Sequence, residues 1–475
     1  MYCQLEALRH CLPPSLRGIL EELPETLDET YERVLREIHK ANREHARRLL
    51  QCLTVAVRPL RVEELAEVLA IDFAAPAHGG IPELNPNWRW ADQHQAVLST
   101  CSSLITIVDD GGSQVVQFSH FSVKEFLTSD RLARSSRDVS RYHIALEPAH
   151  TILTQACLGV LLRLDDRVID YNNDDMPLVE YASRHLFDHA GFEMVASHIR
   201  DAMEYFFDAD KPHWTAWSRV QKIDVQGWWW IAPSDGPLPL YYTSLGGFYD
   251  LAEHLVGKHP EHVNARGGRM ATPLVAALHE KHFRIAELLH RHGADVNLRG
   301  ESNNTLLHAA CNDGILDLNQ WLLNHGADVN TLSDWPCTPL DLAVSWGHPQ
   351  VVRMLIEYNA DINFPTKFGG RPLHLAVAQS DKNDQVGSLQ LLLDHGANPN
   401  AQDDDGFTPL HRCSWWQKGS YRSFHDGSVE GARLLLEYGA IIDVEDNEGR
   451  TPLQFALEHD RQDIAACLRE HGATR

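Results

Sequence analysis

Cysteine pairs, basic residues and long apolar runs are all scarce in this sequence of 475 residues. Its nine cysteines are irregularly spaced and none forms a C-x-x-C pair, which argues against a disulfide framework or a zinc site. The most apolar stretch, 152–164, is interrupted by Gln155 and Arg163 and is shorter than the roughly 20 residues that span a bilayer. No basic stretch followed by an apolar core stands at 1–10, so we expect a cytoplasmic chain, with the nucleus as the alternative.

Basic residues are outnumbered by acidic ones. The chain has 42 lysines and arginines against 66 aspartates and glutamates, a formal net charge of -24. Such a field repels phosphate backbones and anionic lipid surfaces. We therefore expect neither nucleic acid nor a membrane among the partners.

The sequence also lacks the words that mark common catalytic sites. A phosphate-binding loop needs Gly, four residues, and then Gly-Lys followed by Ser or Thr. At the pair Gly257-Lys258, Ala252 takes the place of the first Gly and His259 that of the hydroxyl residue. Nothing marks a nucleophile elbow or a zinc-binding helix. We therefore expect that the chain is not an enzyme and that it binds neither a cofactor nor a metal.

The second half of the chain is a repeat array. A word beginning with Thr-Pro-Leu, or a close variant, recurs with its Leu at positions 274, 307, 340, 373, 410 and 453, in steps of 33, 33, 33, 37 and 43 residues. A fainter unit with Leu240 precedes these, and a His-Gly-Ala-Asp word or a variant of it closes most units, as at 292–295. This period and this word are typical of ankyrin repeats. We predict a solenoid of about seven units over 236–475.

The opening word also has a physical reason. A Thr side chain caps a helix N-terminus, and Pro at the first helical position loses no needed N–H. The second helix of each unit carries a Leu-rich face, as at 391–393, and Gly ends it. The histidines at positions 308, 374 and 411 follow the opening Leu, and we expect them to bond within the turn rather than to bind metal.

The first half predicts a mainly helical structure with a winged helix. Helical spacing marks about 27–38, 44–57 and 59–71, and two strands at 104–108 and 115–118 flank the turn Asp109–Gly112. A further helix is expected at about 122–127. We predict a winged-helix region over 1–135 and a helical linker domain over 136–235.

Two words sharpen this prediction. Leu23–Tyr31 (LPETLDETY) and Phe118–Leu127 (FSHFSVKEFL) resemble the region that follows the nucleotide-binding module in fungal NACHT–ankyrin proteins, a branch of the signal-transduction ATPases. The resemblance implies a signalling or innate-immunity-like (NLR-type) protein. It also implies that a winged-helix His senses the nucleotide, and His120 is the matching position. Because the nucleotide-binding module is missing, we expect His120 to be structural.

Three functional hypotheses follow. The first is a non-catalytic protein–protein interaction scaffold. The second is the regulatory or sensor portion of an ATP-dependent NACHT switch whose nucleotide-binding module is missing or supplied in trans. The third is a DNA-binding regulator, because winged helices also bind DNA. This hypothesis is the weakest, because Lys124 stands beside Glu125 and the helix carries no basic stripe.

The expected binding surface lies at the tips, which are the loops between each closing Gly word and the next Thr-Pro-Leu word. Large aromatic side chains there are costly unless they bind something, and aromatic anchors beside charge are typical of interface hot spots. Trp335 and Phe368 are the preferred anchors, whereas Phe364 and Phe407 have packing on the next unit as an equal alternative. The partner should be a protein with a basic, partly apolar surface. The candidate residues are Trp335, Phe368, Phe364, Phe407, Asp403, Asp404 and Asp405.

Overall fold

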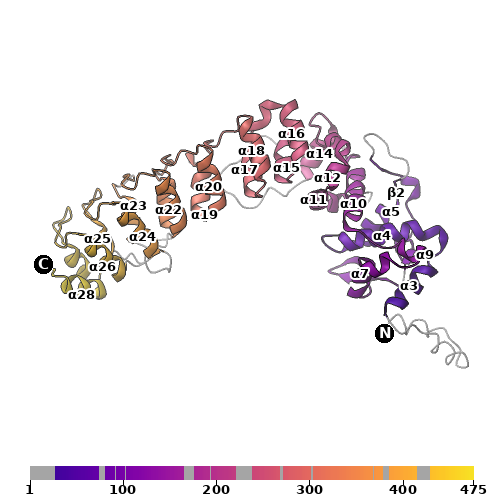
Figure 1. Cartoon of the computed structure of the whole chain (residues 1–475), viewed down its shortest axis with the longest axis horizontal. Helices are drawn as coiled ribbons and strands as arrows, with labels where there is room; N and C mark the ends of the chain where they lie inside the picture. Colours follow the sequence, from indigo (N-terminus) through magenta and orange to yellow (C-terminus); the bar gives the residue numbers. More distant parts are fainter. Residues whose placement is uncertain are drawn as a thin grey trace, which may run out of the picture. The chain divides into compact units, whose positions relative to one another are not determined.

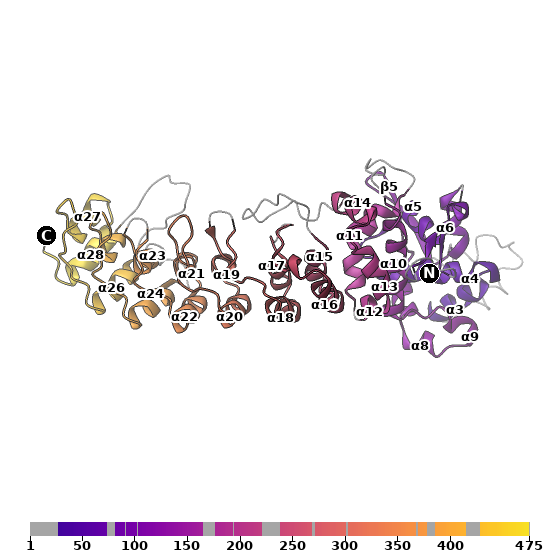
Figure 2. The ribbon, with the colours of Figure 1, turned by 90° about the horizontal axis from the view of Figure 1, so that it is seen from above.

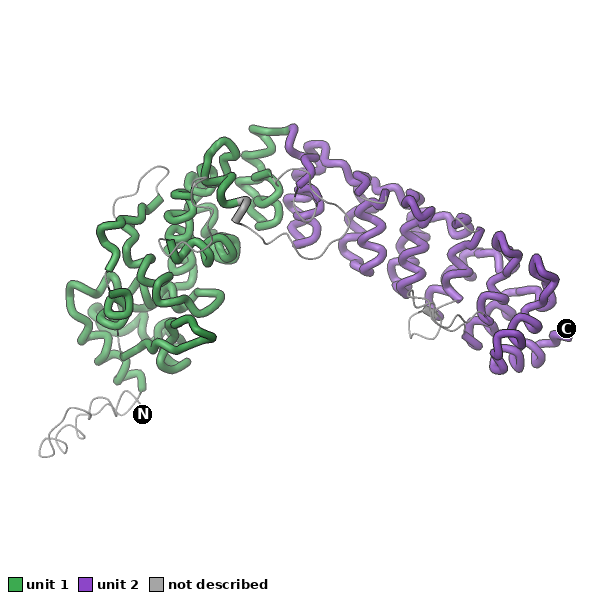
Figure 3. Tube along the Cα trace, turned by 180° about the vertical axis from the view of Figure 1, so that it is seen from behind, with its two compact units in different colours: residues 1–226, 236–260 green, residues 227–235, 261–475 purple. Residues whose placement is uncertain are grey.

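The chain forms two compact units (Figure 3). The first comprises residues 1–226 and 236–260, and the second comprises 227–235 and 261–475. Within the described ranges, no helix combines the length and the apolar character that a membrane crossing requires. The structure is a computed structural model that describes residues 27–73, 81–90, 92–101, 103–164, 176–192, 194–220, 238–267, 271–300, 303–366, 369–377, 385–414 and 428–474.

A winged-helix domain opens the first unit. The side chain of Glu64 starts its third helix by accepting a hydrogen bond from the backbone N–H of Arg61 at 2.8 Å. The guanidinium of Arg58 donates to the same buried carboxylate at 2.7 Å, so a fully buried charge is paired where the chain turns into the helix. The helices are α3 (Leu27–Glu37), α4 (Arg43–Val55), α5 (Val62–Leu69), α6 (Gln93–Cys101) and α7 (Phe121–Leu127).

Strand β5 (Ser113–Phe118) lies at the centre of a three-stranded antiparallel sheet, between β1 (Leu60–Arg61) and β4 (Ile105–Asp110). The β4–β5 hairpin turns at Gly111 and Gly112, whose φ angles of +59° and +97° favour glycine. The predicted winged helix is therefore confirmed. Helix α6, strand β1 and the short β2–β3 pair (Ile71–Asp72 with Glu83–Leu84) were not predicted.

Further helices follow in the first unit, and α10 packs against both α4 and α11. A buried hydrogen-bond chain links these elements. The backbone N–H of Val57 donates to the hydroxyl of Tyr181 at 3.2 Å, and this hydroxyl lies 2.8 Å from Nε2 of His189. Burial lowers the pKa of His189 to about 3, so the ring is neutral in this chain of bonds. The helices are α8 (Asp130–Ala133), α9 (Arg137–Ser140), α10 (Leu146–Leu161), α11 (Leu178–Ala190), α12 (Val195–His198), α13 (Arg200–Phe206) and α14 (Pro212–Val220).

Seven helix pairs of the repeat type are present in the described residues, as predicted, the first in the first unit and the other six in the second (Figure 1). In the second unit, the first helices α17, α19 and α21 lie in one row and their partners α18, α20 and α22 in another (Figure 2). The pairs are α15 (Pro239–Leu245) with α16 (Tyr249–Lys258), α17 (Pro273–His279) with α18 (Phe283–Arg291), α19 (Leu306–Asp313) with α20 (Leu316–Asn324), α21 (Pro339–Ser345) with α22 (Pro349–Glu357), α23 (Pro372–Val377) with α24 (Gln385–Asp394), α25 (Pro409–Arg412) with α26 (Val429–Glu437), and α27 (Pro452–Glu458) with α28 (Gln462–Glu470).

Local sequence sets the start of each first helix. The Thr272 hydroxyl accepts from the N–H of Val275 at 3.3 Å and the Thr338 hydroxyl from that of Asp341 at 3.2 Å, the bonds of an N-cap. Proline follows each of these threonines at the first helical position. Each repeat is named below by its opening residue, so that α21 and α22 belong to the Thr338 repeat.

Candidate protein-binding surface

Each fully described tip of the second unit is a five-residue turn closed by a backbone hydrogen bond. Ser333 donates to the carbonyl of Cys337 at 3.2 Å, Asp403 to that of Phe407 at 3.0 Å, and Asp446 to that of Arg450 at 2.9 Å. The tip is thus a small closed loop whose side chains either fix the turn or face outward. The predicted site residues divide between these two roles.

Asp403 fixes its own tip. Its Oδ1 atom accepts from the backbone N–H groups of Asp405 and Phe407 at 3.1 and 2.9 Å, and its Oδ2 atom pairs with the guanidinium of Arg412. The side chain is fully buried. Asp404 and Asp405 are exposed, so these two carboxylates present the charge of the predicted acidic run to solvent.

Phe407 is buried, with 5% of its surface exposed. Its ring centroid lies 5.0 Å from that of Phe455 in the next repeat, and the guanidinium carbons of Arg412 and Arg450 lie 5.0 and 5.9 Å from it. This is the alternative placement, in which the ring packs on the next unit. Phe407 is therefore not on the surface that a partner meets.

The other predicted aromatic residues differ in their placement. Trp335 is 66% exposed at the tip of the Thr338 repeat, which is unusual for so large a ring. Phe364 is half-buried where the chain enters the next tip. Phe368 lies outside the described residues.

Trp346 was missed in the sequence, although 60% of its surface is exposed. It ends α21, directly before Gly347, which turns the chain with φ +70°. Trp335 precedes the same helix, so the two exposed indoles flank a seven-residue helix that is about 10 Å long at 1.5 Å per residue. An aromatic residue immediately before the Gly that ends a first helix is the signal that would have found it.

Exposed carboxylates stand in the same tip as Trp335 and at the ends of the preceding first helices. Asp334 stands beside Trp335 in the same tip, and Asp313 ends α19, the first helix of the preceding repeat, which packs against α21. Glu280 holds the corresponding position after α17. The first-helix ends and tips therefore expose two large aromatic rings and several negative charges.

The histidines at positions 308, 374 and 411 are structural, as expected. Nδ1 of His308 accepts from the backbone N–H of Thr305 at 3.1 Å, and Nε2 lies 3.0 Å from the carbonyl oxygen of Cys337. His374 and His411 make the same two bonds in their own repeats. Burial lowers the pKa of His308 and His374 to about 4, so both ring nitrogens serve the fold as a neutral imidazole.

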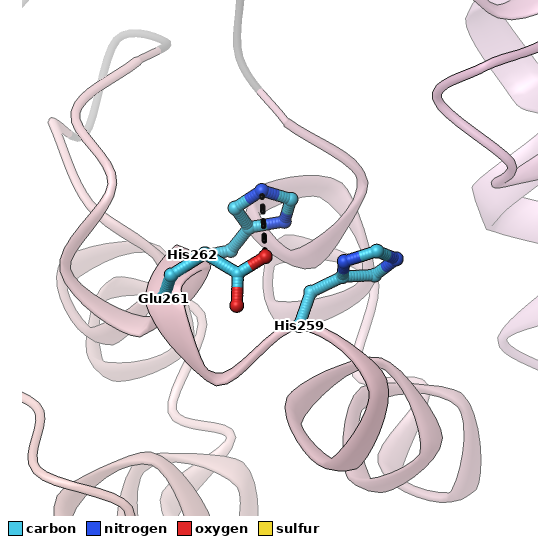
Figure 4. A group of neighbouring side chains, drawn as sticks. All are labelled: His259, Glu261 and His262. Carbon is cyan, nitrogen blue, oxygen red and sulfur yellow. Dashed lines mark ion pairs between the residues drawn. The ribbon is translucent and has the colours of Figure 1, made fainter.

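One group among the described residues has the composition of a metal site: His259, Glu261 and His262 (Figure 4). Nε2 of His262 lies 3.8 Å from a carboxylate oxygen of Glu261, a loose ion pair of neighbouring residues. His259 belongs to the first unit and the other two residues to the second. We therefore assign no coordination geometry to this group.

His120 caps helix α7 in the winged-helix domain. Its Nδ1 atom accepts from the backbone N–H of Ser122 at 3.2 Å, and the Ser122 hydroxyl lies 2.8 Å from that of Tyr31. The ring is exposed. A shallow pocket nearby is formed by loop 56–59 and strand β5, and Arg58 at its edge is already paired with Glu64.

Comparison with known proteins matches both halves of the chain. A model of ankyrin repeats in three copies matches 240–333, 274–366 and 340–425, and a single ankyrin-repeat model matches 405–447. The winged-helix domain model of GPI inositol-deacylase matches 31–138. The azaphilone pigments biosynthesis cluster protein L of Monascus ruber is 31% identical over 292 residues, which cover 57% of this chain and 60% of that protein. The match thus spans less than two thirds of the relative's length.

Proposed function

We propose that this chain is a non-catalytic scaffold that binds a protein partner on the tips and first-helix ends of its ankyrin repeats, centred on the Thr338 repeat. The observation that carries the proposal is the pair of exposed indoles, Trp335 and Trp346, at the two ends of α21. Folding alone does not favour leaving two such rings in water, whereas burying them against a partner provides the aromatic anchors of a binding hot spot.

The partner's chemistry follows from the exposed carboxylates of the tips and first-helix ends. The exposed carboxylates of Asp313, Asp334, Asp404 and Asp405 favour a basic surface, and arginine in particular pairs with carboxylates and stacks on indole. We therefore propose a protein segment that carries arginine or lysine next to apolar side chains.

Selection from a displayed peptide library tests this proposal. We expect the immobilised chain to enrich peptides that combine basic and apolar residues, and the double variant Trp335→Ala/Trp346→Ala to lose that enrichment. The double variant Trp88→Ala/Trp90→Ala is the matched control, because these two tryptophans are 45% and 51% exposed on the first unit. Equal enrichment on wild type and Trp335→Ala/Trp346→Ala would refute the proposed surface.

We propose a signalling or NLR-type context for the scaffold, with the sensor portion of a NACHT switch as the second candidate. The match to a winged-helix domain next to ankyrin repeats favours this arrangement, and the resemblance that gives His120 the nucleotide-sensing position motivates the second candidate. The name of the Monascus ruber relative places that protein in a pigment biosynthesis cluster and states no reaction. Titrating the chain with ATP, with and without a separately expressed nucleotide-binding module, distinguishes the two candidates.

We further propose that the chain acts in the cytoplasm and binds no DNA. The net charge of -24 supports the second point, since it opposes approach to a phosphate backbone. Helix α7 would be the DNA-reading helix of the winged helix, yet it carries Glu125 beside Lys124. A mobility shift that weakens with rising salt would instead establish the DNA-binding alternative.

A further inference from the structure

Side-chain hydrogen bonds, here called rungs, join consecutive repeats in the second unit, and four kinds of them recur along the array. The first kind comes from the first helix. His308, His374 and His411 each approach, with Nε2, the carbonyl oxygen that closes the next tip, at 3.0, 3.0 and 3.1 Å. Asp341 holds this position in the Thr338 repeat. Its Oδ1 atom is buried and has no hydrogen-bond partner among the described residues, so the first-helix rung to the Arg371 repeat is missing.

The second kind of rung is made by asparagines that follow the second helices. Asn297 makes two bonds to the next repeat, from Nδ2 to the carbonyl of Gly326 at 3.0 Å and from the N–H of Asp328 to Oδ1 at 2.8 Å. Asn330 and Asn400 also make two bonds each. Asn363, which leads from the Thr338 repeat into the Arg371 repeat, contributes one described bond.

That one bond runs from the backbone N–H of Asn398 to Oδ1 of Asn363 at 3.2 Å. It is longer than the corresponding bonds at Asn297 and Asn330, both 2.8 Å. The asparagine rung is thus present but weakened between the Thr338 and Arg371 repeats.

The third kind of rung joins neighbouring tips. The guanidinium of Arg266 donates to the carbonyl of Arg299 at 2.8 Å, that of Arg299 to the carbonyl of Leu332 at 3.2 Å, and the amide of Gln402 to the carbonyl of Glu445 at 3.0 Å. Leu332 itself stands 33 residues after Arg299 and has no polar side-chain atom. From this position the Thr338 repeat therefore sends no such bond to the described residues of the tip that follows it.

The fourth kind of rung joins second helices through the residue that ends each one. His325 contacts Glu287 of the preceding repeat at 2.8 Å, the Tyr358 hydroxyl accepts from the amide of Gln320 at 2.8 Å, and the Tyr438 hydroxyl donates to Asp394. His395 holds this position in the Arg371 repeat. Its Nδ1 atom donates to the carbonyl of Leu391 in its own helix at 2.8 Å, as Nδ1 of His325 does to Trp321 at 2.7 Å. Unlike His325, the His395 ring makes no described contact with the second helix of the preceding repeat.

Among the described residues, all four kinds of rung are thus missing or weakened at one joint, between the Thr338 and Arg371 repeats. In a solenoid, stability is a sum of intrinsic repeat terms and nearest-neighbour terms. The loss of these hydrogen bonds lowers the neighbour term of this joint, where α21 packs on α23 and α22 packs on α24. We propose that the array has a hinge at this joint and opens as two cooperative blocks, the Thr272, Thr305 and Thr338 repeats and the Arg371, Thr408 and Thr451 repeats.

The hinge also adjoins the exposed tryptophans. Trp335 and Trp346 lie in the last repeat of the first block, and Phe364 leads into the first tip of the second block. A partner that touches both blocks closes the hinge and one that touches a single block leaves it open. The hinge itself rests on the rungs and does not depend on the proposed function.

Hydrogen exchange of the full chain in rising urea tests the hinge. We expect helices α17–α22 and α23–α28 to lose protection with two different dependences on urea. Two variants restore a rung: Asp341→His supplies the ring found in the other repeats, and Leu332→Arg brings a guanidinium toward the carbonyl of Pro365, as Arg299 reaches that of Leu332. Each restored bond should slow exchange in the weaker block by roughly fivefold.

Leu332→Met is the matched control, because it keeps the size of Leu332 without adding a donor. Leu332 is half-buried at a tip, so Leu332→Arg remains informative even where Asp341→His fails to fold. A single urea dependence for all helices from α17 to α28 in the wild type would overturn the hinge. An unchanged difference between the blocks in a folded Leu332→Arg variant would overturn it as well.

Discussion

Oδ2 of Asp341 accepts two hydrogen bonds from Thr338, from the backbone N–H at 2.8 Å and from the hydroxyl at 2.9 Å. Its Oδ1 atom, by contrast, is buried with no hydrogen-bond partner among the described residues. Burial consequently raises the pKa of this carboxyl to about 6. Asp341, which caps the start of α21 together with Thr338, therefore also places a poorly solvated charge inside the array at neutral pH.

This relationship predicts a pH-dependent gain in stability for Asp341→Asn. A carboxyl whose pKa is raised on folding stabilises the fold when it is protonated, and that contribution is lost as pH rises from about 4 through about 6. The amide keeps an acceptor for Thr338 and cannot ionise. We expect its advantage over the wild type to grow by about 1 kcal/mol between pH 5 and pH 7.5 in urea unfolding.

The buried histidines change the stability with pH in the opposite direction, but their contribution is the same in the wild type and in Asp341→Asn and cancels between the two proteins. Because burial lowers the pKa of His308 and His374 to about 4, their contribution is complete above pH 6.5 and falls as pH drops toward 4 in both proteins. The charged residues of α22, Arg353 and Glu357, are exposed and unaltered. An advantage that stays constant across the pH range would show that Asp341 does not titrate in this window.

Two neighbouring aspartates should respond very differently to alanine. Asp403 is buried, holds two backbone N–H groups of its tip and pairs with Arg412, so Asp403→Ala leaves these groups unsatisfied. We expect it to lower the free energy of unfolding by about 2 to 4 kcal/mol. Asp404→Ala, at an exposed side chain, should change it by less than about 0.5 kcal/mol. Equal melting temperatures for the two variants would contradict this assignment.

The repeat architecture was predictable because its signals are local. The opening threonines and prolines start helices through bonds within four residues, and the closing glycines take positive φ, as at Gly439 with +85°. The structural role of His308 followed from the same word. The role of Asp403 did not, because a run of three aspartates looks equally solvated at each position until the turn selects one of them to fold inward.

Contacts between residues far apart in the sequence explain the other differences between the predictions and the structure. Strand β1 is only two residues long, and it exists because Leu60 pairs with Val116 in β5, 56 positions later. Phe407 looked exposed as a tip residue, but the longer Thr408 repeat still brings Phe455 against its ring. Trp346 was not predicted as a binding residue, because it stands at a helix end and the prediction considered only the tips.

We expect the chain to bind neither ATP nor ADP in calorimetric titrations. The phosphate-binding word is incomplete at Ala252 and His259. Nδ1 of His120, the nucleotide-sensing position implied by the resemblance, is engaged by the N–H of Ser122. A micromolar site would contradict this expectation, and its loss in His120→Ala would place it at the winged helix.

Trp335 and Phe407 should respond oppositely to the same substitution, although both stand in tips. Phe407 is buried against Phe455, so Phe407→Ala leaves a cavity between two repeats and should destabilise the second unit by about 3 to 5 kcal/mol. Trp335 is 66% exposed, so Trp335→Ala should change the melting temperature very little. Instead it should weaken binding of a selected peptide by about 2 kcal/mol or more, since an aromatic anchor is removed. Peptide titration and thermal melts of the two variants give both readouts. Unaltered binding together with an early melt for Trp335→Ala would mean that this ring packs inside the fold and that the partner docks elsewhere.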